Sequence, residues 1–524
     1  MISLPSTAMR RISRMKLGEI AGEVILAGID GPQLTERERD VLREVGPGGY
    51  VLFSKNITSL EGGRNLCDDL TALTEVARGV KPFIAADQEG GAVTMLPSEA
   101  TQFPSMMSIG AGRKTMNAFK IATLVATELR AIGINMDLAP VMDISNNPDS
   151  PLIGTRSFWD DANTVAQFGA KFIEGLRQGR VLSVAKHFPG HGDTDIDSHS
   201  GLPTIRHDVK RLEAVELAPF RKAVASGVDG IMVSHVALTR VDPEPTPSSL
   251  SKNVVSGLLR RRLSFPGLIM TDLLMMDAVT KMLDVDEAAV AAIEAGNDMV
   301  LACEGVDMAQ DVRSAIIAKA KGDKAFAKRL KRRAARVMAT KESKLRNFRK
   351  PSPSIVGCNS HVAEVTKIVE SCVALVYDDG ALPISQRLRV ASFSAVQGDL
   401  LDDEIRTELE RSMPPGQIIS HEKIVAGEML PLGRSRAADV SLVFTKDLSK
   451  NHEVLDQVNR VLGMSRQSVV IAVNSPYDLR IIRKPSAYVA TYSPDPISIQ
   501  VAVKALSGKA TLVGAAVPNL EVPG

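Results

Sequence analysis

The chain has 524 residues, of which 44% are hydrophobic and 24% are charged, and this composition excludes a disordered or fibrous protein. Its formal net charge is only +2, so the overall charge points neither to nucleic acid nor to an acidic membrane surface. A chain of this length is too long for one typical hydrophobic core, and two domains are therefore expected.

Four cysteines are spread along the chain at Cys67, Cys303, Cys358 and Cys372. Their spacing fits neither a C-x-x-C motif nor a zinc ribbon, so neither a disulfide framework nor structural zinc is expected. Near the amino terminus, Glu19 and Glu23 interrupt the apolar stretch that a signal peptide needs. No apolar run is long enough to span a membrane. These features predict a cytoplasmic protein without a membrane partner.

Short apolar runs rich in β-branched residues recur through the first two thirds of the chain. Eight of them predict strands, at 24–28, 50–53, 82–87, 134–140, 182–188, 230–236, 267–272 and 299–303. Between most of them lie segments with helical apolar spacing, such as 117–133 and 163–179. Continuous apolar strands that alternate with amphipathic helices indicate a parallel sheet covered on both faces. Eight such units predict an α/β fold of the (β/α)₈ TIM-barrel type.

The segment 328–350 is rich in lysine and arginine, and Leu330, Ala334 and Val337 recur in it at helical spacing. It predicts a helix that closes the barrel and turns a basic face to solvent. Binding of nucleic acid through this face is the less favoured interpretation. Pro351 and Pro353 then mark a linker.

Beyond the linker, four more apolar runs predict strands separated by helical segments, at 372–378, 389–395, 440–445 and 468–474. They predict a second, smaller α/β sandwich domain. The predicted boundaries are 1–350 for the barrel, 351–355 for the linker and 356–524 for the second domain.

Charged side chains follow several predicted barrel strands. Asp87, Lys186, His187, His235 and Asp272 lie at or just after the carboxyl ends of their strands. In a parallel barrel the loops at that end build the active site. These side chains are therefore expected to gather at one rim of the barrel.

The segment "KHFPGHGDTDIDSH", residues 186–199, holds three histidines and three aspartates. These groups could bind zinc or a harder cation, but their spacing fits neither an H-E-x-x-H helix nor an EF-hand loop. We therefore expect no metal and no other cofactor. A polar turn is a second interpretation, and it suits residues 193–195 well.

A third interpretation of this segment is an acid–base pair. Asp197 and His199 are two residues apart, so both side chains can project to the same side of an extended loop. A carboxylate bonded to one imidazole nitrogen supports the cation that forms at the other nitrogen, as a general acid/base requires. Asp272, directly after a buried strand, is either a helix cap or a nucleophile toward an acetal carbon.

The chain resembles the β-N-acetylglucosaminidases of glycoside hydrolase family 3, the NagZ-like enzymes, in their two-domain form. The resemblance is carried by residues 186–199 and by further blocks in the family's order, which include "GPGGYVLFSKNI", "ADQEGGAV", "INMDLAPVMDISNNPDSPLIGTRSF", "GLIMTDLLMMDA" and "AIEAGNDMVL". It extends from about Met15 to the basic helix, and the region after the linker resembles the family's second domain only loosely.

This resemblance implies a barrel enzyme that removes terminal β-linked N-acetylglucosamine with retention, by way of a covalent glycosyl-enzyme. Asp272 matches the family's nucleophile, His199 its general acid/base and Asp197 the partner of that histidine. The implied substrate is a small carbohydrate, a disaccharide or muropeptide from peptidoglycan recycling.

The resemblance also implies which side chains hold the sugar. The residues that match those contacting the sugar hydroxyls are Asp87, Arg156, Lys186 and His187. The Gly- and Pro-rich surroundings of the dyad imply a mobile loop that delivers His199 on closure.

Two departures from the family pattern concern the site. Ala92 and Met95 stand where family members usually carry arginines, so either a basic residue from another loop compensates for them or sugar binding is weaker or altered. Leu273 follows Asp272 where a polar or small residue is usual, and an apolar setting would raise the pKa of this carboxyl and blunt it as a nucleophile.

Other functions stay open at this point. A phosphorylase would use the same residues, because a neutral histidine does not repel phosphate. A catalytically weak sugar-binding module and a metal-dependent barrel hydrolase are further alternatives. No nucleic-acid partner is expected, and the sequence leaves the oligomeric state unknown.

Overall fold

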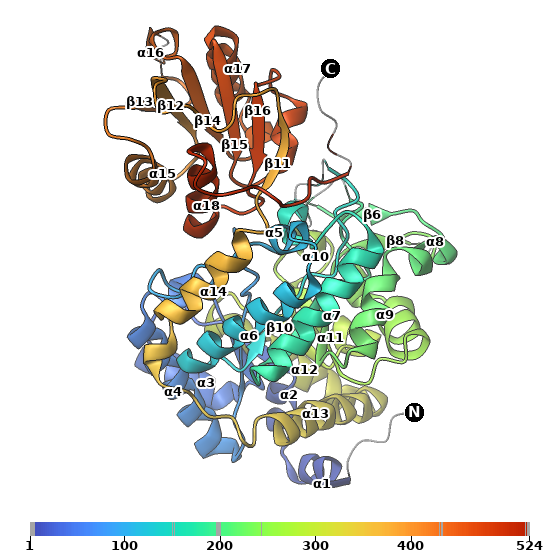
Figure 1. Ribbon diagram of the computed structural model, residues 1–524. Helices are drawn as coiled ribbons and strands as arrows, with labels where there is room; N and C mark the ends of the chain where they lie inside the picture. Colours follow the sequence, from blue (N-terminus) through green and yellow to red (C-terminus); the bar gives the residue numbers. More distant parts are fainter. Residues whose placement is uncertain are drawn as a thin grey trace.

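The structure is a computed structural model that describes residues 6–148, 150, 152–194, 197, 201–242, 244–428, 430, 433–518 and 520. It contains a closed parallel barrel and, after it in the chain, a smaller domain built on a mixed sheet (Figure 1). This two-domain α/β architecture confirms the fold class predicted from the sequence.

Among the described residues, eight parallel strands close the barrel in the order β1-β10-β9-β7-β5-β4-β3-β2. Their bounds are β1 (Ile25–Ala27), β2 (Gly49–Leu52), β3 (Phe83–Ala86), β4 (Met136–Asp137), β5 (Leu182–Phe188), β7 (Gly230–Val233), β9 (Leu268–Leu273) and β10 (Met299–Ala302). Each one overlaps a predicted strand. Apolar side chains such as Leu26, Phe83 and Met270 fill the interior, so the barrel is a packed core and not a pore.

Helices surround the barrel. The main ones are α2 (Leu17–Glu23), α3 (Glu36–Val45), α4 (Leu60–Arg78), α6 (Thr115–Ile132), α7 (Ala162–Gln178), α9 (Leu217–Ala225), the π-helix η4 (Asn253–Arg262), α11 (Val285–Ala295) and α12 (Gly305–Gly322). Side-chain caps fix several of their starts. Thr35 accepts a hydrogen bond from the Glu38 amide at α3, and Asp161 accepts one from the Thr164 amide at α7.

Shorter elements connect these helices or lie at the ends of the barrel. They are α1 (Ser6–Arg14), α5 (Met106–Ala111), α8 (Val209–Ala214) and α10 (Asp277–Thr280), the strands β6 (Thr204–Ile205) and β8 (Ala237–Leu238), and the 3₁₀ turns η1 (Ser54–Asn56), η2 (Gly154–Arg156) and η3 (Ser248–Leu250). Figure 1 places α1 at one end of the barrel and α5, α10, β6 and β8 at the other.

The basic helix α13 (Lys324–Lys344) closes one end of the barrel, but its basic side chains do not all face solvent. Lys341 is fully buried and lies 2.6 Å from the Glu23 carboxylate. Arg336 lies 2.5 Å from the buried Asp298 carboxylate. The prediction of a wholly solvated basic face is therefore wrong in part, because these cations neutralise carboxylates inside the barrel wall.

The second domain is built on a six-stranded sheet, counted over the described residues, in the order β11-β16-β15-β14-β12-β13. The strands are β11 (Ala374–Asp378), β12 (Val390–Ala395), β13 (Ile418–Lys423), β14 (Val440–Thr445), β15 (Gln467–Ala472) and β16 (Ala487–Ala490). β11 pairs antiparallel with β16, and the other pairs are parallel. The four predicted strands are present, whereas β13 and β16 were not predicted.

Helices and turns complete this domain. They are α14 (Asn359–Val369), α15 (Asp399–Ser412), α16 (Gly433–Ala437), α17 (His452–Met464), α18 (Pro496–Leu506), and the turns η5 (Pro353–Ile355), η6 (Leu448–Lys450) and η7 (Pro476–Arg480). In Figure 1 the sheet of this domain and the helices α15–α18 lie beside the end of the barrel that bears α5, away from α1 and α13, whereas α14 lies alongside the barrel helix α6. Among the described residues, no helix is both long and apolar enough to cross a lipid bilayer.

Candidate active site

A cavity of about 230 Å³ opens at the carboxyl ends of the barrel strands. Its charged lining residues come from four loops or strand ends and are Asp87, Glu89, Arg156, Lys186, His187 and Asp272. Met95 and Leu273 supply part of its apolar wall. The five predicted residues of this set therefore share one cavity with Glu89, which the sequence analysis had not singled out.

The buried Lys186, the partly buried Arg156 and two carboxylates form a network at one side of the cavity. The Arg156 guanidinium donates to both Glu89 oxygens, from Nε and Nη2, at 2.9 Å each. The Lys186 ammonium lies 2.6 Å from Glu89 Oε1 and 2.5 Å from Asp87 Oδ1. Such bidentate and charge-assisted bonds hold planar groups in fixed orientations. The network therefore presents rigidly oriented donors and acceptors to the cavity.

The network fixes the charge state of its members. Burial disfavours the charge on Lys186, yet the carboxylates of Asp87 and Glu89 raise the pKa of its ammonium above the ordinary value. Burial likewise opposes ionisation of Glu89, but Arg156 and Lys186 bring the pKa of this carboxyl far below its ordinary value. Lys186 and Glu89 are consequently both charged at neutral pH.

His187 is held by a carboxylate that the sequence analysis missed. Asp143 Oδ2 lies 2.6 Å from His187 Nδ1 and accepts the His187 backbone amide at 3.1 Å. Its other oxygen, Oδ1, accepts the amide of His191 at 2.7 Å. On the far side of the ring, His187 Nε2 lies 3.3 Å from Arg156 Nη2. Asp143 thus orients the imidazole and anchors the start of the following loop.

Asp272 lies near the end of β9 with its carboxylate partly buried. The backbone amide of Leu273 donates to Asp272 Oδ1 at 2.8 Å. Burial alone would raise the pKa of this carboxyl, but His187, His235, the Leu273 amide and Lys186 lower it below the ordinary value. The expectation that Leu273 creates an apolar setting with a raised pKa is wrong, because its backbone amide and the nearby cations outweigh its side chain.

His235 is hydrogen-bonded to the end of β9. Its Nε2 donates to the Leu273 carbonyl at 2.9 Å, and its Nδ1 lies 2.7 Å from the Ser249 hydroxyl. The side chain is fully buried and is absent from the described lining of the cavity. Its role is therefore to fix the strand end that carries Asp272.

Only part of the predicted acid–base dyad can be placed. Asp197 is half-buried and makes a polar contact, whereas His199 lies outside the described residues. The start of their loop is tied to the barrel rim, because Asn147 donates to the Thr194 carbonyl at 3.3 Å.

The described part of the chain offers one group of three side chains with donor atoms close enough to share a metal ion, and it differs from the histidine–aspartate set considered in the sequence. It consists of Asp193, His207 and Glu216, whose donor atoms lie within 4.8 Å of one another. The Glu216 carboxylate already accepts two bonds from Arg211, at 2.9 and 3.0 Å. The guanidinium supplies the positive charge here, so this group does not indicate a metal centre.

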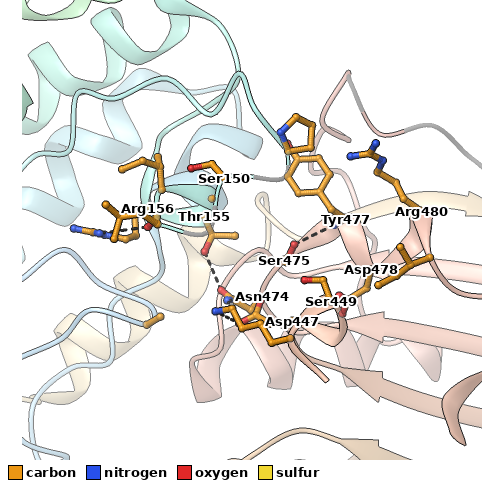
Figure 2. A pocket seen from close by; sticks show the side chains of 17 residues that line it. Ser150, Thr155, Arg156, Asp447, Ser449, Asn474, Ser475, Tyr477, Asp478 and Arg480 are labelled. Atoms are coloured by element: carbon orange, nitrogen blue, oxygen red, sulfur yellow. Dashed lines mark hydrogen bonds and ion pairs between the residues drawn. The ribbon is translucent and has the colours of Figure 1, made fainter. Parts of the chain in front are cut away.

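A larger cavity of about 670 Å³ lies between the barrel and the second domain (Figure 2). Arg156 and Leu152 line this interdomain cavity as well as the smaller cavity. The second domain contributes polar side chains to it, among them Asp447, Asn474 and Tyr477. The two cavities therefore meet at Arg156.

A closed parallel barrel with charged side chains gathered at the carboxyl ends of its strands defines the class of barrel enzymes. A family model described as "Glycosyl hydrolase family 3 N terminal domain" matches residues 12–340, more than half of the chain. The chain belongs to glycosyl hydrolase family 3. The family resemblance predicted from the sequence is thereby confirmed.

Similar proteins include the beta-hexosaminidase A of Pseudoalteromonas piscicida, 33% identical over 270 residues, with 48% of this chain and 45% of that protein covered. The beta-hexosaminidase of Neisseria meningitidis strain FAM18 is 34% identical over 296 residues, and the match covers 55% of this chain and 80% of that protein. The chain thus spans less than half of the first relative and four fifths of the second.

A solved structure resembles nearly the whole chain. It is a glycoside hydrolase family 3 beta-N-acetylglucosaminidase from Paenibacillus sp. str. FPU-7, with a TM-score of 0.89 and 28% sequence identity. The match covers 97% of this chain and all of that chain. The similarity therefore includes the second domain as well as the barrel.

Proposed function

We propose that this protein is a retaining exo-β-N-acetylglucosaminidase. The observation that carries the proposal is Asp272, a carboxyl with a lowered pKa that shares a small cavity with the Asp87, Lys186, Glu89 and Arg156 network. At about 230 Å³ the cavity is smaller than the roughly 300–1,000 Å³ of typical ligand sites, and it suits one sugar ring. The beta-hexosaminidase and beta-N-acetylglucosaminidase names of the relatives support the same activity.

In the first proposed step, an Asp272 carboxylate oxygen attacks the anomeric carbon of the sugar. The bond from that carbon to the glycosidic oxygen breaks, and His199 protonates the departing oxygen. A covalent glycosyl-enzyme forms on Asp272 and the leaving group becomes an alcohol. His187, Lys186 and the Leu273 amide keep Asp272 ionised, as this attack requires.

In the second proposed step, His199 removes a proton from water, and the water oxygen attacks the same anomeric carbon. The bond to Asp272 breaks, and the carboxylate is restored. Two inversions at one carbon give net retention. Asp197 would hold the imidazole and stabilise the cation that His199 becomes in the first half of this step.

The charged network would hold the sugar. Asp87 and Glu89 can accept hydrogen bonds from sugar hydroxyls, while Lys186, Arg156 and the Nε2 side of His187 can interact with hydroxyl oxygens. Because these groups are already oriented by each other, binding costs little further ordering. Met95, in place of a family arginine, leaves that side of the cavity apolar.

We further propose a cell-wall disaccharide or muropeptide as substrate, with its leaving group in the interdomain cavity, and the cytoplasm as the compartment. The position of this cavity supports the first point, because it meets the sugar cavity at Arg156. The small cavity would then hold the terminal sugar, and the larger one the remainder of the substrate.

The direct test is release of p-nitrophenol from its β-N-acetylglucosaminide by the purified protein beside an Asp272→Asn variant. We expect the variant to lose about 10³-fold or more in kcat, because an amide cannot act as the nucleophile. Unchanged turnover in the variant would contradict the proposed role of Asp272. No turnover in the parent would favour the alternative of a sugar-binding module.

Phosphorolysis is the second candidate, because a neutral histidine at the acid/base position tolerates an incoming phosphate. Repeating the assay in phosphate separates the two activities. A hydrolase gives free N-acetylglucosamine at all phosphate concentrations, whereas a phosphorylase gives the sugar 1-phosphate with a rate that rises with phosphate.

A further inference from the structure

A hydrogen-bond chain joins the second domain to the loop that carries Arg156. Thr155, the preceding residue, donates from its hydroxyl to Asn474 Oδ1 at 2.8 Å. Asn474 Nδ2 in turn donates to both oxygens of Asp447, at 3.0 Å each. A carboxylate only accepts, so the amide nitrogen must face Asp447 and the amide oxygen must face Thr155. Figure 2 shows this chain crossing the interdomain cavity.

The chain is buried at its centre. Thr155 and Asn474 are 7% and 9% exposed, so water does not readily replace either partner. Thr155 lies in the turn η2, which ends at Arg156, and only one peptide bond separates the two residues. Displacement of the Thr155 hydroxyl would therefore shift the base of the Arg156 side chain.

A second set of contacts leads from the second domain to the Glu89 loop. The Ser105 amide donates to the Ser493 hydroxyl at 2.9 Å, and the Ser105 hydroxyl donates to the Tyr492 carbonyl at 2.5 Å. Ser105 packs tightly under Gly91, because a Cβ added to Gly91 would lie 2.7 Å from the Ser105 Cβ. The loop that carries Glu89 therefore rests on a segment fixed by the second domain.

These two sets of contacts converge on one ion pair. Arg156 and Glu89 are joined by two bonds of 2.9 Å, and each belongs to a loop that the second domain supports. We propose that Asn474 and Ser493 of the second domain are positioning residues for the sugar site, acting through the Arg156–Glu89 pair. The sugar contacts in this inference rest on the proposed function, whereas the positioning of the two loops does not.

The closest competing account is that these bonds only hold two domains together. A purely adhesive bond would change stability and leave the kinetics for a small substrate unchanged. A positioning bond changes the affinity for the sugar first, because the sugar contacts are the groups that move. The contrast between KM and kcat therefore separates the two accounts.

The test uses a matched pair at position 155 of the full chain. Thr155→Ser keeps the hydroxyl, and Thr155→Val removes it at nearly the same volume. We expect Thr155→Val and Asn474→Ala each to raise KM for the p-nitrophenyl β-N-acetylglucosaminide about three- to tenfold, the effect of one buried hydrogen bond, with kcat within about twofold. Thr155→Ser should keep the KM of the parent.

Two controls sharpen this test. The double variant Thr155→Val/Asn474→Ala should raise KM no further than either single variant, since both remove the same bond. Asn459→Ala makes the same substitution elsewhere in the second domain, at a side chain that accepts the Arg483 amide at 2.7 Å, and should leave KM unchanged. Additive effects, or equal effects of Thr155→Val and Thr155→Ser, would overturn the inference.

A readout independent of turnover keeps the inference testable if the proposed function fails. Amide hydrogen exchange should increase in peptides that cover residues 152–157 in Asn474→Ala, and in those that cover 88–93 in Ser493→Ala, relative to Asn459→Ala. A parent without turnover would then overturn the proposed function alone. Unchanged exchange in both peptides would overturn the positioning role of the second domain.

Discussion

Asp272 has two histidines, one lysine and one amide donor near its carboxylate. Burial opposes its ionisation, but His187, His235, the Leu273 amide and Lys186 lower the pKa of this carboxyl below the ordinary value near 3.8. A nucleophile must be ionised, so activity is present above this lowered pKa and is lost as the pH falls through it. We therefore expect the acidic limb of kcat/KM to lie below about pH 4.

Rates measured across the acidic range, with each sample re-assayed at pH 7 to exclude unfolding, check this expectation. An acidic limb with an apparent pKa above about 5 would contradict the expectation, because it would show that the apolar side chain of Leu273 raises the pKa of the Asp272 carboxyl.

Glu89 pairs with two cations at once. In a Glu89→Gln variant, Arg156 loses its carboxylate partner and Lys186 keeps only Asp87, so both donors of the proposed sugar site lose part of their support. We expect the free energy of unfolding to fall by about 3–5 kcal/mol and KM to rise about tenfold or more. Chemical unfolding and steady-state kinetics measure the two quantities.

The matched control for this prediction is Glu213→Gln, which breaks an ion pair with Arg262 on the surface. Surface pairs of this kind contribute little, so this variant should behave as the parent does. Equal effects of the two substitutions would contradict the special position of Glu89.

Residues at strand ends were the predictable part of the site. Asp87, Lys186, His187 and Asp272 end or directly follow apolar strands, and such residues necessarily meet at one rim of a parallel barrel. Glu89 and Asp143 were missed because they lie in irregular loops, where no periodicity reports the direction of a side chain. For Glu89 a signal was present, since it stands in the same "ADQEGGAV" block as Asp87.

At the scale of elements, a histidine of α14 bonds to a barrel helix. His361 Nδ1 lies 2.7 Å from Glu128 of α6, and this bond raises the pKa of the imidazole above its ordinary value near 6.5. A raised folded-state pKa means that the stabilisation is complete below about pH 6.5 and is lost as the pH rises through the folded-state pKa.

We therefore expect His361→Gln to lower the midpoint of thermal unfolding by roughly 2–5 °C at pH 6 and by much less at pH 9. The exposed His452 of the second domain provides the control, and His452→Gln should show no such dependence. A loss of equal size at both pH values would indicate that the imidazole acts as a neutral partner.

The elements themselves were predictable where burial is complete. Most barrel strands, and β12, β14 and β15 of the second domain, lie in largely apolar runs because both of their faces are covered. β11 was also predicted although it is a half-buried edge strand, whereas the short, fully buried β16 was not. The strand β13 escaped prediction because it is an edge strand with the sequence "IISHEK" and is only half-buried along its length. In α13, the sequence could not show that Arg336 and Lys341 point inward, because their carboxylate partners lie far away in the chain.

At the scale of the whole molecule, the interdomain cavity is expected to set the preference for the leaving group. Ser449 of the second domain lines this cavity and is exposed. A Ser449→Trp variant should lower kcat/KM about tenfold for a disaccharide substrate, because the indole occupies space that the second sugar needs, and much less for the p-nitrophenyl glycoside. Equal losses on the two substrates would argue against a leaving group in this cavity.

The central claim of this account is covalent catalysis by Asp272. Its most direct test is intact-protein mass spectrometry after incubation with an activated 5-fluoro β-N-acetylglucosaminide, whose second step is slow because fluorine destabilises the developing cation. The account predicts one added glycosyl mass, located by peptide mapping on Asp272 and absent from Asp272→Asn. Turnover of this substrate with no adduct, or an adduct on another residue, would contradict it.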